Sequence, residues 1–143
     1  EMCIRDSANG KRPIQASGRI ASSTNPATWS TYRDIKASQA GDGFGVMLGP
    51  MPGDDSGLGC YDFDFCVFGE TIAPWAVNVI SSIPEPVVYV ELSVSGTGLH
   101  VFFETQVFGP GSKRDGVERY TKDRFIRMGT PVRIVGNKVK RGR

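Results

Sequence analysis

Two aspartates, Asp62 and Asp64, stand one residue apart inside an apolar run over residues 58–65. If this run is a strand, both carboxylates point to the same face of a sheet. Adjacent carboxylates repel each other unless a proton or a cation lies between them, and hard oxygen ligands suit Mg²⁺ or Mn²⁺. The run contains no Lys or Arg that could pair with them. The pattern indicates either a divalent-metal site or a strand with an acidic polar face.

A second segment, Ser95–His100, holds the only histidine of the chain, just after the turn Gly96-Thr97-Gly98. The hydroxyl, the backbone N–H groups and the imidazole can converge on one anion, because amides in such turns form anion-binding concavities. A tight hairpin with a structural histidine explains the same residues equally well. A dinucleotide-binding fingerprint is excluded, because no third glycine follows at the required spacing and no helix begins there.

A third carboxylate, Glu118, starts a later strand-like run, and Arg124 opens the next one. Glu118 can add a carboxylate to the aspartate pair. It also has basic neighbours, Arg114 and Arg119, so a surface ion pair is the alternative.

The candidate side chains must be positioned by regular elements, and the hydrophobic periodicity of the sequence predicts both helices and strands. Apolar residues at helical spacing predict an amphipathic helix over 72–83, and a shorter helix is expected over 27–38. The predicted strands cover residues 43–48, 58–65, 87–94, 99–105, 117–121, 124–128 and 132–135. The two runs around the glycine-rich turn form a hairpin. This order of elements predicts an α+β sheet domain.

The composition is that of one globular domain: 143 residues, 39% hydrophobic and 22% charged. No apolar run approaches the length of a membrane span, and no signal peptide is visible. The three cysteines, Cys3, Cys60 and Cys66, cannot all pair, and their spacing does not suit a zinc site. We therefore expect a reduced, cytoplasmic protein.

Charge is strongly segregated along the chain. Residues 37–112 contain nine acids and no Lys or Arg, whereas residues 8–36 carry five bases and one acid, and residues 113–143 eleven bases and three acids. An acidic centre between basic flanks suits a metal-binding pocket beside a phosphate-contacting surface. The basic tail over 138–143, taken alone, predicts a solvated or disordered end.

The first seven residues resemble the in-frame translation of a transposon-end sequencing adapter. We expect residues 1–7 to be non-native. Residues 8–143 are expected to form a single domain that is truncated at both ends.

The combination of motifs is more specific than any one of them. Asp-x-Asp, then Ser-Gly-x-Gly-x-His, then Gly-Val-Glu-x-Tyr followed by Arg-Phe occur in this order. The chain thus resembles, over roughly residues 11–130, the bifunctional DNA primase-polymerase domain of phages and plasmids, within the archaeo-eukaryotic primase superfamily. Phe63 between the acids and Val94 before the serine depart from the usual pattern, but no motif residue is missing.

The resemblance implies a fold, a reaction and partners. The fold is an archaeo-eukaryotic primase-like core, with a small α/β module packed on an RRM-like, antiparallel-rich sheet and the active site in the cleft between them. The reaction is template-directed nucleotidyl transfer with two Mg²⁺ or Mn²⁺ ions, on a DNA template or primer with NTP or dNTP. A helicase domain downstream in a longer chain is a further implied partner.

The resemblance also assigns roles to single residues. The metal ligands are Asp62, Asp64 and Glu118, which are catalytic together with His100. The nucleotide-binding residues are Ser95, Gly96, Gly98, His100 and Arg124.

Two other functions compete with this interpretation. A non-catalytic nucleic-acid-binding module would need no divalent ion but would expose aromatic rings near basic groups, for which Tyr120 and Phe125 are the candidates. A rolling-circle nuclease requires a histidine pair and a nucleophilic tyrosine, and the single histidine argues against it. The phosphate-binding loop of a helicase does not occur in the sequence.

Overall fold

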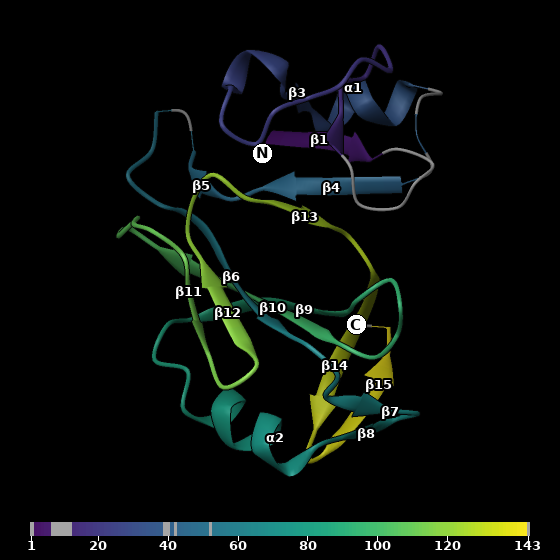
Figure 1. Cartoon of the computed structure of the whole chain (residues 1–143), viewed down its shortest axis with the longest axis vertical. Coiled ribbons are helices and arrows are strands. Elements are labelled where there is room, and N and C mark those ends of the chain that lie inside the picture. Colours follow the sequence, from purple (N-terminus) through teal and green to yellow (C-terminus); the bar gives the residue numbers. More distant parts are fainter. Residues whose placement is uncertain (1, 7–12, 39–40, 42, 52, 143) are drawn as a thin grey trace.

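The computed structural model describes residues 2–6, 13–38, 41, 43–51 and 53–142. Two antiparallel sheets lie one above the other (Figure 1). Helix α1 (Tyr32–Ala37) accompanies the small upper sheet, and helix α2 (Pro74–Ser81) packs below the large sheet. Within the described ranges, no helix is long and apolar enough to cross a membrane.

The small sheet has the strand order β13-β4-β1-β2, with β3 also paired to β1. Its strands are β1 (Met2–Asp6), β2 (Pro13–Ile14), β3 (Ser30–Thr31), β4 (Gly43–Met47) and β13 (Phe125–Arg127). Residues 2–6 of the segment expected to be non-native therefore form a strand of this sheet. A short 3₁₀ helix, η1 (Pro26–Thr28), precedes β3.

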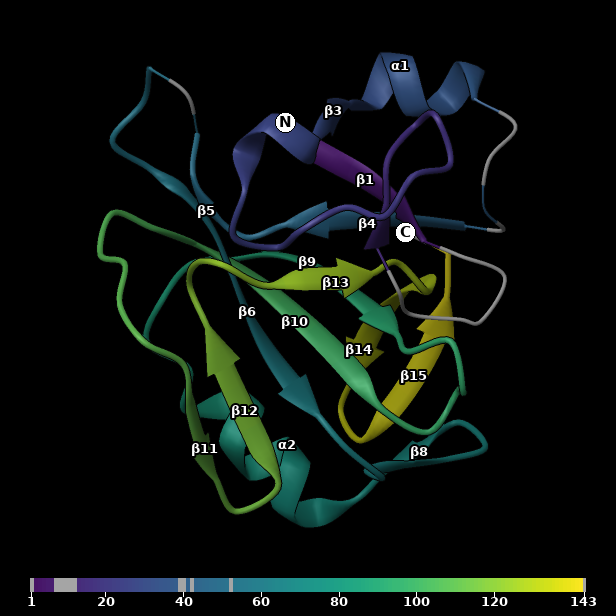
Figure 2. The same ribbon diagram turned by 45° about the horizontal axis from the view of Figure 1, so that its top comes forward.

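The large sheet has the order β11-β12-β6-β10-β9-β14-β15-β8-β7, with β5 also paired to β6, and it curls into a half-barrel (Figure 2). Its strands are β5 (Gly49–Pro50), β6 (Gly57–Phe63), β7 (Val67–Phe68), β8 (Thr71–Ile72), β9 (Val87–Leu92), β10 (Leu99–Thr105), β11 (Ser112–Arg114), β12 (Val117–Tyr120), β14 (Thr130–Val135) and β15 (Lys138–Arg141).

The two faces of the large sheet differ in their partners because side chains alternate along each strand. One face packs against α2 through a buried cluster that includes Phe63, Leu99 and Val101. The other face turns toward the small sheet, and a second cluster there joins Cys60 and Phe102 to side chains of α1, β4 and β13. Residues of β6 and β10 therefore contribute alternately to two cores.

The predicted α+β class is wrong. The chain is mostly antiparallel β, with α1 and α2 as the α-helices of its described part, and it lacks an α+β primase core or an RRM-like α/β arrangement. The physical reason is the scarcity of helix-forming segments. One eight-residue helix covers one face of the large sheet, and the small sheet with one six-residue helix covers the other.

Single elements agree better with the sequence. The hairpin of β9 and β10 and the helix within 72–83 form as predicted. The expected helix over 27–38 is instead η1, β3 and α1. The tail is not disordered, because residues 138–141 form β15, which pairs with β14 and buries Val139.

A polar network ties the loop after α2 to the lower face of the large sheet. Tyr61 donates a hydrogen bond to Glu85 at 2.7 Å, and Arg119 donates to the same carboxylate. The Arg119 guanidinium lies over the Phe103 ring, 5.0 Å from its centroid. Burial alone would raise the pKa of Glu85, but the hydrogen bonds from Arg119 and Tyr61 outweigh it and hold this pKa below 4.5.

We predict that Glu85→Gln lowers the free energy of unfolding by about 1 kcal/mol at neutral pH, because it removes a half-buried ion pair. A depressed carboxyl pKa stabilises the folded state above the unfolded-state value, and this stabilisation is lost as the pH falls through the folded-state value. The difference between wild type and variant should therefore shrink below pH 4.5. Urea unfolding at several pH values measures this difference in unfolding free energy. Glu70→Gln, on the exposed surface, is the control. The prediction is contradicted if wild type and Glu85→Gln differ by the same free energy at every pH in the acid range.

Candidate functional site

Four polar residues form one row across four neighbouring strands of the large sheet. In the antiparallel register, Asp62 of β6 lies opposite both Glu118 of β12 and His100 of β10, and His100 lies opposite Glu91 of β9. Residues directly opposite each other point to the same face, with Cα atoms about 4.5–5.5 Å apart. The row lies on the face that turns toward the small sheet, since its neighbours along the strands, such as Phe102, belong to the core on that side.

The imidazole of His100 lies between two carboxylates. Its Nδ1 atom is 2.9 Å from Oε1 of Glu91, and its Nε2 atom is 3.6 Å from Oδ1 of Asp62. His100 and Glu91 are buried, whereas the side chain of Asp62 is 19% exposed. The open end of this array is therefore the Asp62 end.

A hollow of about 190 Å³ opens beside Asp62 and His100. It brings together residues from the end of β6 and from the β9–β10 hairpin. Its lining consists of Asp62, Asp64, Phe65, Ser93, Ser95, Thr97, Gly98 and His100. The predicted residues Asp62, Asp64, Ser95, Gly98 and His100 thus share one concave surface.

Asp64 reaches the hollow from beyond the strand rather than from within it. Strand β6 ends at Phe63, and Phe65 adopts a positive φ of 48° that turns the chain. The N–H groups of Cys66 and Val67 then both donate to the carbonyl of Thr97, at 2.9 and 3.0 Å. These bonds tie the segment after Asp64 to the glycine-rich turn.

The turn lines the hollow with hydroxyl groups. The Ser95 hydroxyl lies 3.0 Å from that of Ser93 and 2.9 Å from that of Thr97. The N–H of Gly98 donates to the Ser93 hydroxyl at 3.1 Å, and a Cβ at Gly98 would lie only 2.5 Å from the Phe63 carbonyl oxygen. Gly98 therefore permits the close approach of the turn to β6.

The remaining predicted residues lie outside the lining of the hollow. Gly96 is in the turn with a φ of 78°. Glu118 is in the row beside Asp62, but its carboxylate accepts a hydrogen bond from the Tyr120 hydroxyl. Arg124 precedes β13 and stacks over the Tyr120 ring, 4.4 Å from its centroid. The hydrogen bond to Glu118, together with burial, raises the pKa of Tyr120.

The donor chemistry of the hollow fits a divalent cation. Asp62 and Asp64 provide hard oxygen ligands, and no Lys or Arg is among the lining residues. No group of three His, Cys, Asp or Glu side chains in the described ranges is arranged to hold a metal ion by itself. Mg²⁺ is commonly bound by one or two carboxylates, with water and substrate phosphates completing the shell. The residues therefore fit an ion that a substrate helps to hold.

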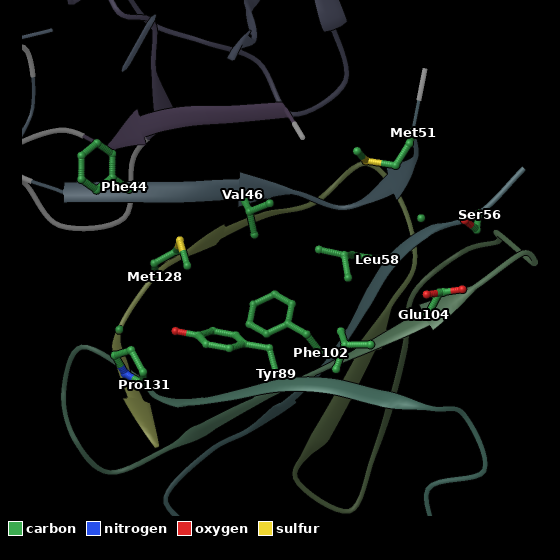
Figure 3. A pocket seen from close by; sticks show the side chains of 13 residues that line it. Phe44, Val46, Met51, Ser56, Leu58, Tyr89, Phe102, Glu104, Met128 and Pro131 are labelled. Carbon is green, nitrogen blue, oxygen red and sulfur yellow. The ribbon is translucent and has the colours of Figure 1, made fainter. Parts of the chain in front are cut away.

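A larger cavity, which the sequence did not predict, lies between the two sheets. Its volume is about 800 Å³. Figure 3 shows Val46 and Met128 on one side of it and Tyr89, Leu58 and Phe102 on the other. Tyr89 and Phe102 stand two residues from Glu91 and His100 on the same strands, so this apolar cavity adjoins the polar row. The full lining is Phe44, Val46, Met51, Ser56, Gly57, Leu58, Val88, Tyr89, Phe102, Glu104, Met128, Gly129 and Pro131.

Sequence reasoning missed four residues of the site: Glu91 in the row and Phe65, Ser93 and Thr97 in the lining of the hollow. The sequence did contain a signal for Glu91. Val90 and Leu92 alternate with it, so Glu91 must point to the face of the strand opposite to these two apolar side chains. For Ser93 and Thr97, the signal is the spacing of two between hydroxyl residues around Ser95.

The Cys60 thiol lies next to the row, on the same strand and face as Asp62. Burial first, and then the negative charges of Asp62 and Glu91, raise the pKa of Cys60 well above its usual value. Cys60 and Cys66 are both buried and free of disulfide bonds. Cys60 is therefore held as a buried thiol in this structure.

Comparison with protein-family models and with curated proteins found no match to this chain. The likeness to primase-polymerase domains therefore rests on the motif residues alone.

We predict that the hollow binds Mn²⁺ and that Asp62→Asn weakens this binding at least tenfold, because it removes a charged oxygen ligand. Electron paramagnetic resonance of free Mn²⁺ measures the binding. Asp55→Asn, in an exposed loop, is the matched control. Equal Mn²⁺ affinity in wild type and Asp62→Asn contradicts a metal site at the hollow.

Proposed function

We propose that this domain catalyses template-directed nucleotidyl transfer in the replication of phage or plasmid DNA. The observation that carries the proposal is the strand register, which puts Glu118, Asp62 and His100 in one row, next to a hollow with Asp64 and three hydroxyl groups. Carboxylates beside phosphate-binding groups are the combination that this chemistry needs.

The charge of the hollow supports a metal-dependent reaction. A nucleoside triphosphate is repelled by Asp62 and Asp64 unless a cation lies between them. Residues that would hold such ions are Asp62 and Asp64, with Glu118 from the neighbouring strand. When bound, divalent ions lower the pKa of an attacking hydroxyl and neutralise the charge on the leaving pyrophosphate.

The other residues of the hollow bind and orient the nucleotide. The hydroxyls of Ser95 and Thr97 are exposed donors for phosphate oxygens. Nε2 of His100 lies 3.6 Å from Oδ1 of Asp62, and both residues line the hollow, so we assign the imidazole to a phosphate held beside the metal ligands. Arg124 lies outside the hollow, stacked on Tyr120, and adds positive charge near Glu118.

The template is proposed to contact basic side chains outside the hollow. Eleven Lys and Arg residues lie in residues 113–143, and several of them, such as Lys113, Arg114 and Lys122, are exposed. Contacts of this kind release counterions and weaken as salt concentration rises. Buried free thiols at Cys60 and Cys66 agree with a proposed site of action in the reducing cytoplasm.

The two aromatic residues that the sequence offered to a purely stacking nucleic-acid binder, Tyr120 and Phe125, are not presented for stacking. Such a module presents aromatic rings to bases. Tyr120 is half-buried, with its ring covered by Arg124 and its hydroxyl bonded to Glu118. Phe125 is half-buried and packs against the cluster of Ala21 and Met47.

We predict that the protein extends a primed template only with Mg²⁺ or Mn²⁺, and that Asp64→Ala lowers extension at least a thousandfold. Template binding should be unchanged or tighter, because its affinity rests on Lys and Arg and the substitution removes a charge that repels phosphates. Parallel primer-extension and gel-shift assays measure the two effects.

The matched control is Asp55→Ala, which removes a carboxylate from an exposed loop. Equal extension by wild type and Asp64→Ala contradicts the polymerase proposal. Template binding without extension by the wild type, with or without divalent ions, favours the non-catalytic binding module instead.

A further inference from the structure

Glu91 is the most unusual ionisable residue outside the predicted site. It stands in β9 opposite His100 and Pro131, and its exposed fraction is 0%. Carboxylates are rarely fully buried, because losing their hydration is costly unless they are paired. A replacement by an apolar residue would avoid that cost, so the acid requires a positive reason.

The partner of Glu91 is the single histidine. Its Oε1 atom lies 2.9 Å from Nδ1 of His100, while its Oε2 atom is buried without a hydrogen-bond partner in the described part of the chain. The pair therefore leaves part of the carboxylate uncompensated. A residue selected for stability alone would not leave a buried oxygen unpaired.

The contact fixes the state of the imidazole. A carboxylate oxygen is a hydrogen-bond acceptor, so the 2.9 Å contact favours an imidazole whose Nδ1 carries the hydrogen and donates it to Glu91. The other nitrogen, Nε2, lies 3.6 Å from Oδ1 of Asp62, and both residues line the hollow. A ring flip would break the Nδ1 contact and leave the buried Glu91 side chain without its partner. A carboxylate on the far nitrogen is a common way to fix the tautomer and the orientation of a functional histidine.

We propose that Glu91 is a positioning residue: it holds His100 with Nδ1 protonated and presents Nε2 to the hollow between Asp62 and the hydroxyl-bearing turn. The expected effect of Glu91 on catalysis rests on the proposed nucleotidyl transfer. Its effect on the tautomer of His100 does not depend on that proposal. Loss of Glu91 should therefore change both the imidazole and, separately, the reaction.

The test is a long-range ¹H–¹⁵N correlation spectrum of the ¹⁵N-labelled protein at neutral pH. Because the sequence holds one histidine, the imidazole signals need no assignment. Wild type should show a protonated Nδ1, and Glu91→Gln should shift the signals toward the other tautomer or an exchanging mixture. Glu70→Gln, an exposed acid-to-amide change, should leave them as in wild type.

Two results overturn the proposal: an unprotonated Nδ1 in the wild type, or the wild-type imidazole pattern in Glu91→Gln. The wild-type measurement stands even if Glu91→Gln does not fold, and Glu91→Asp then supplies a shorter carboxylate that should lose the Nδ1 contact.

In primer extension, Glu91→Gln should lower kcat roughly 10- to 100-fold with template affinity unchanged. If the wild type extends primers and Glu91→Gln does so with the same kcat, the positioning role is also overturned. If the wild type does not extend primers, the proposed function is contradicted. The ¹H–¹⁵N correlation spectrum still tests whether Glu91 positions His100.

Discussion

The antiparallel register of β12, β6, β10 and β9 is the constraint on which the structure depends. Side chains alternate along the part of these strands that carries the row, so a slip of one residue there would exchange the polar row with the apolar face under it. Phe63 and Val101, buried against α2, oppose such a slip. Burying each of these side chains contributes about 1.5–3 kcal/mol. Packing on one face thus fixes the position of Asp62 and His100 on the other.

The same alternation sorts charges by face. On the lower face, Arg119 pairs with Glu85 in a half-exposed network that includes Tyr61. On the upper face, Asp62 and Glu91 approach one imidazole, and no Lys or Arg lines the adjoining hollow. The lower network is therefore balanced, whereas the upper face keeps an excess of negative charge. That imbalance makes a cation or a positively charged ligand the natural complement of the site.

Local patterns predicted much of this arrangement. Alternation identified β9, β10 and the turn between them, and the likeness to primase-polymerase domains put Ser95 and His100 in one site with Asp62. The lateral order of strands could not be predicted, because the pairing of Asp62 with Glu118 depends on contacts far apart in sequence. Glu91 was missed because a lone acid in an apolar strand looks like a solvent-facing position. Its burial comes from the small sheet and β14, which no local pattern reveals.

The largest errors came from giving composition or likeness too much weight. The basic character of residues 138–143 concealed the alternation around Val139, which is buried in a strand. The order of the predicted elements and the motif likeness both led to an α+β architecture, although only one segment of the sequence has a full amphipathic helical face. Motif residues can share a site on a sheet whatever covers that sheet, so the motifs and the fold class must be judged separately.

The pairing of β13 with β4 has a consequence for how the protein is made. Ile126 lies opposite Val46, so the small sheet combines residues from both ends of the chain. Contacts between residues so distant in sequence form slowly, since a long loop must close first. During synthesis, β4 leaves the ribosome long before β13 exists. The edge of β4 that pairs with β13 then stays open until β13 has emerged, a period in which chaperone binding or aggregation competes with folding.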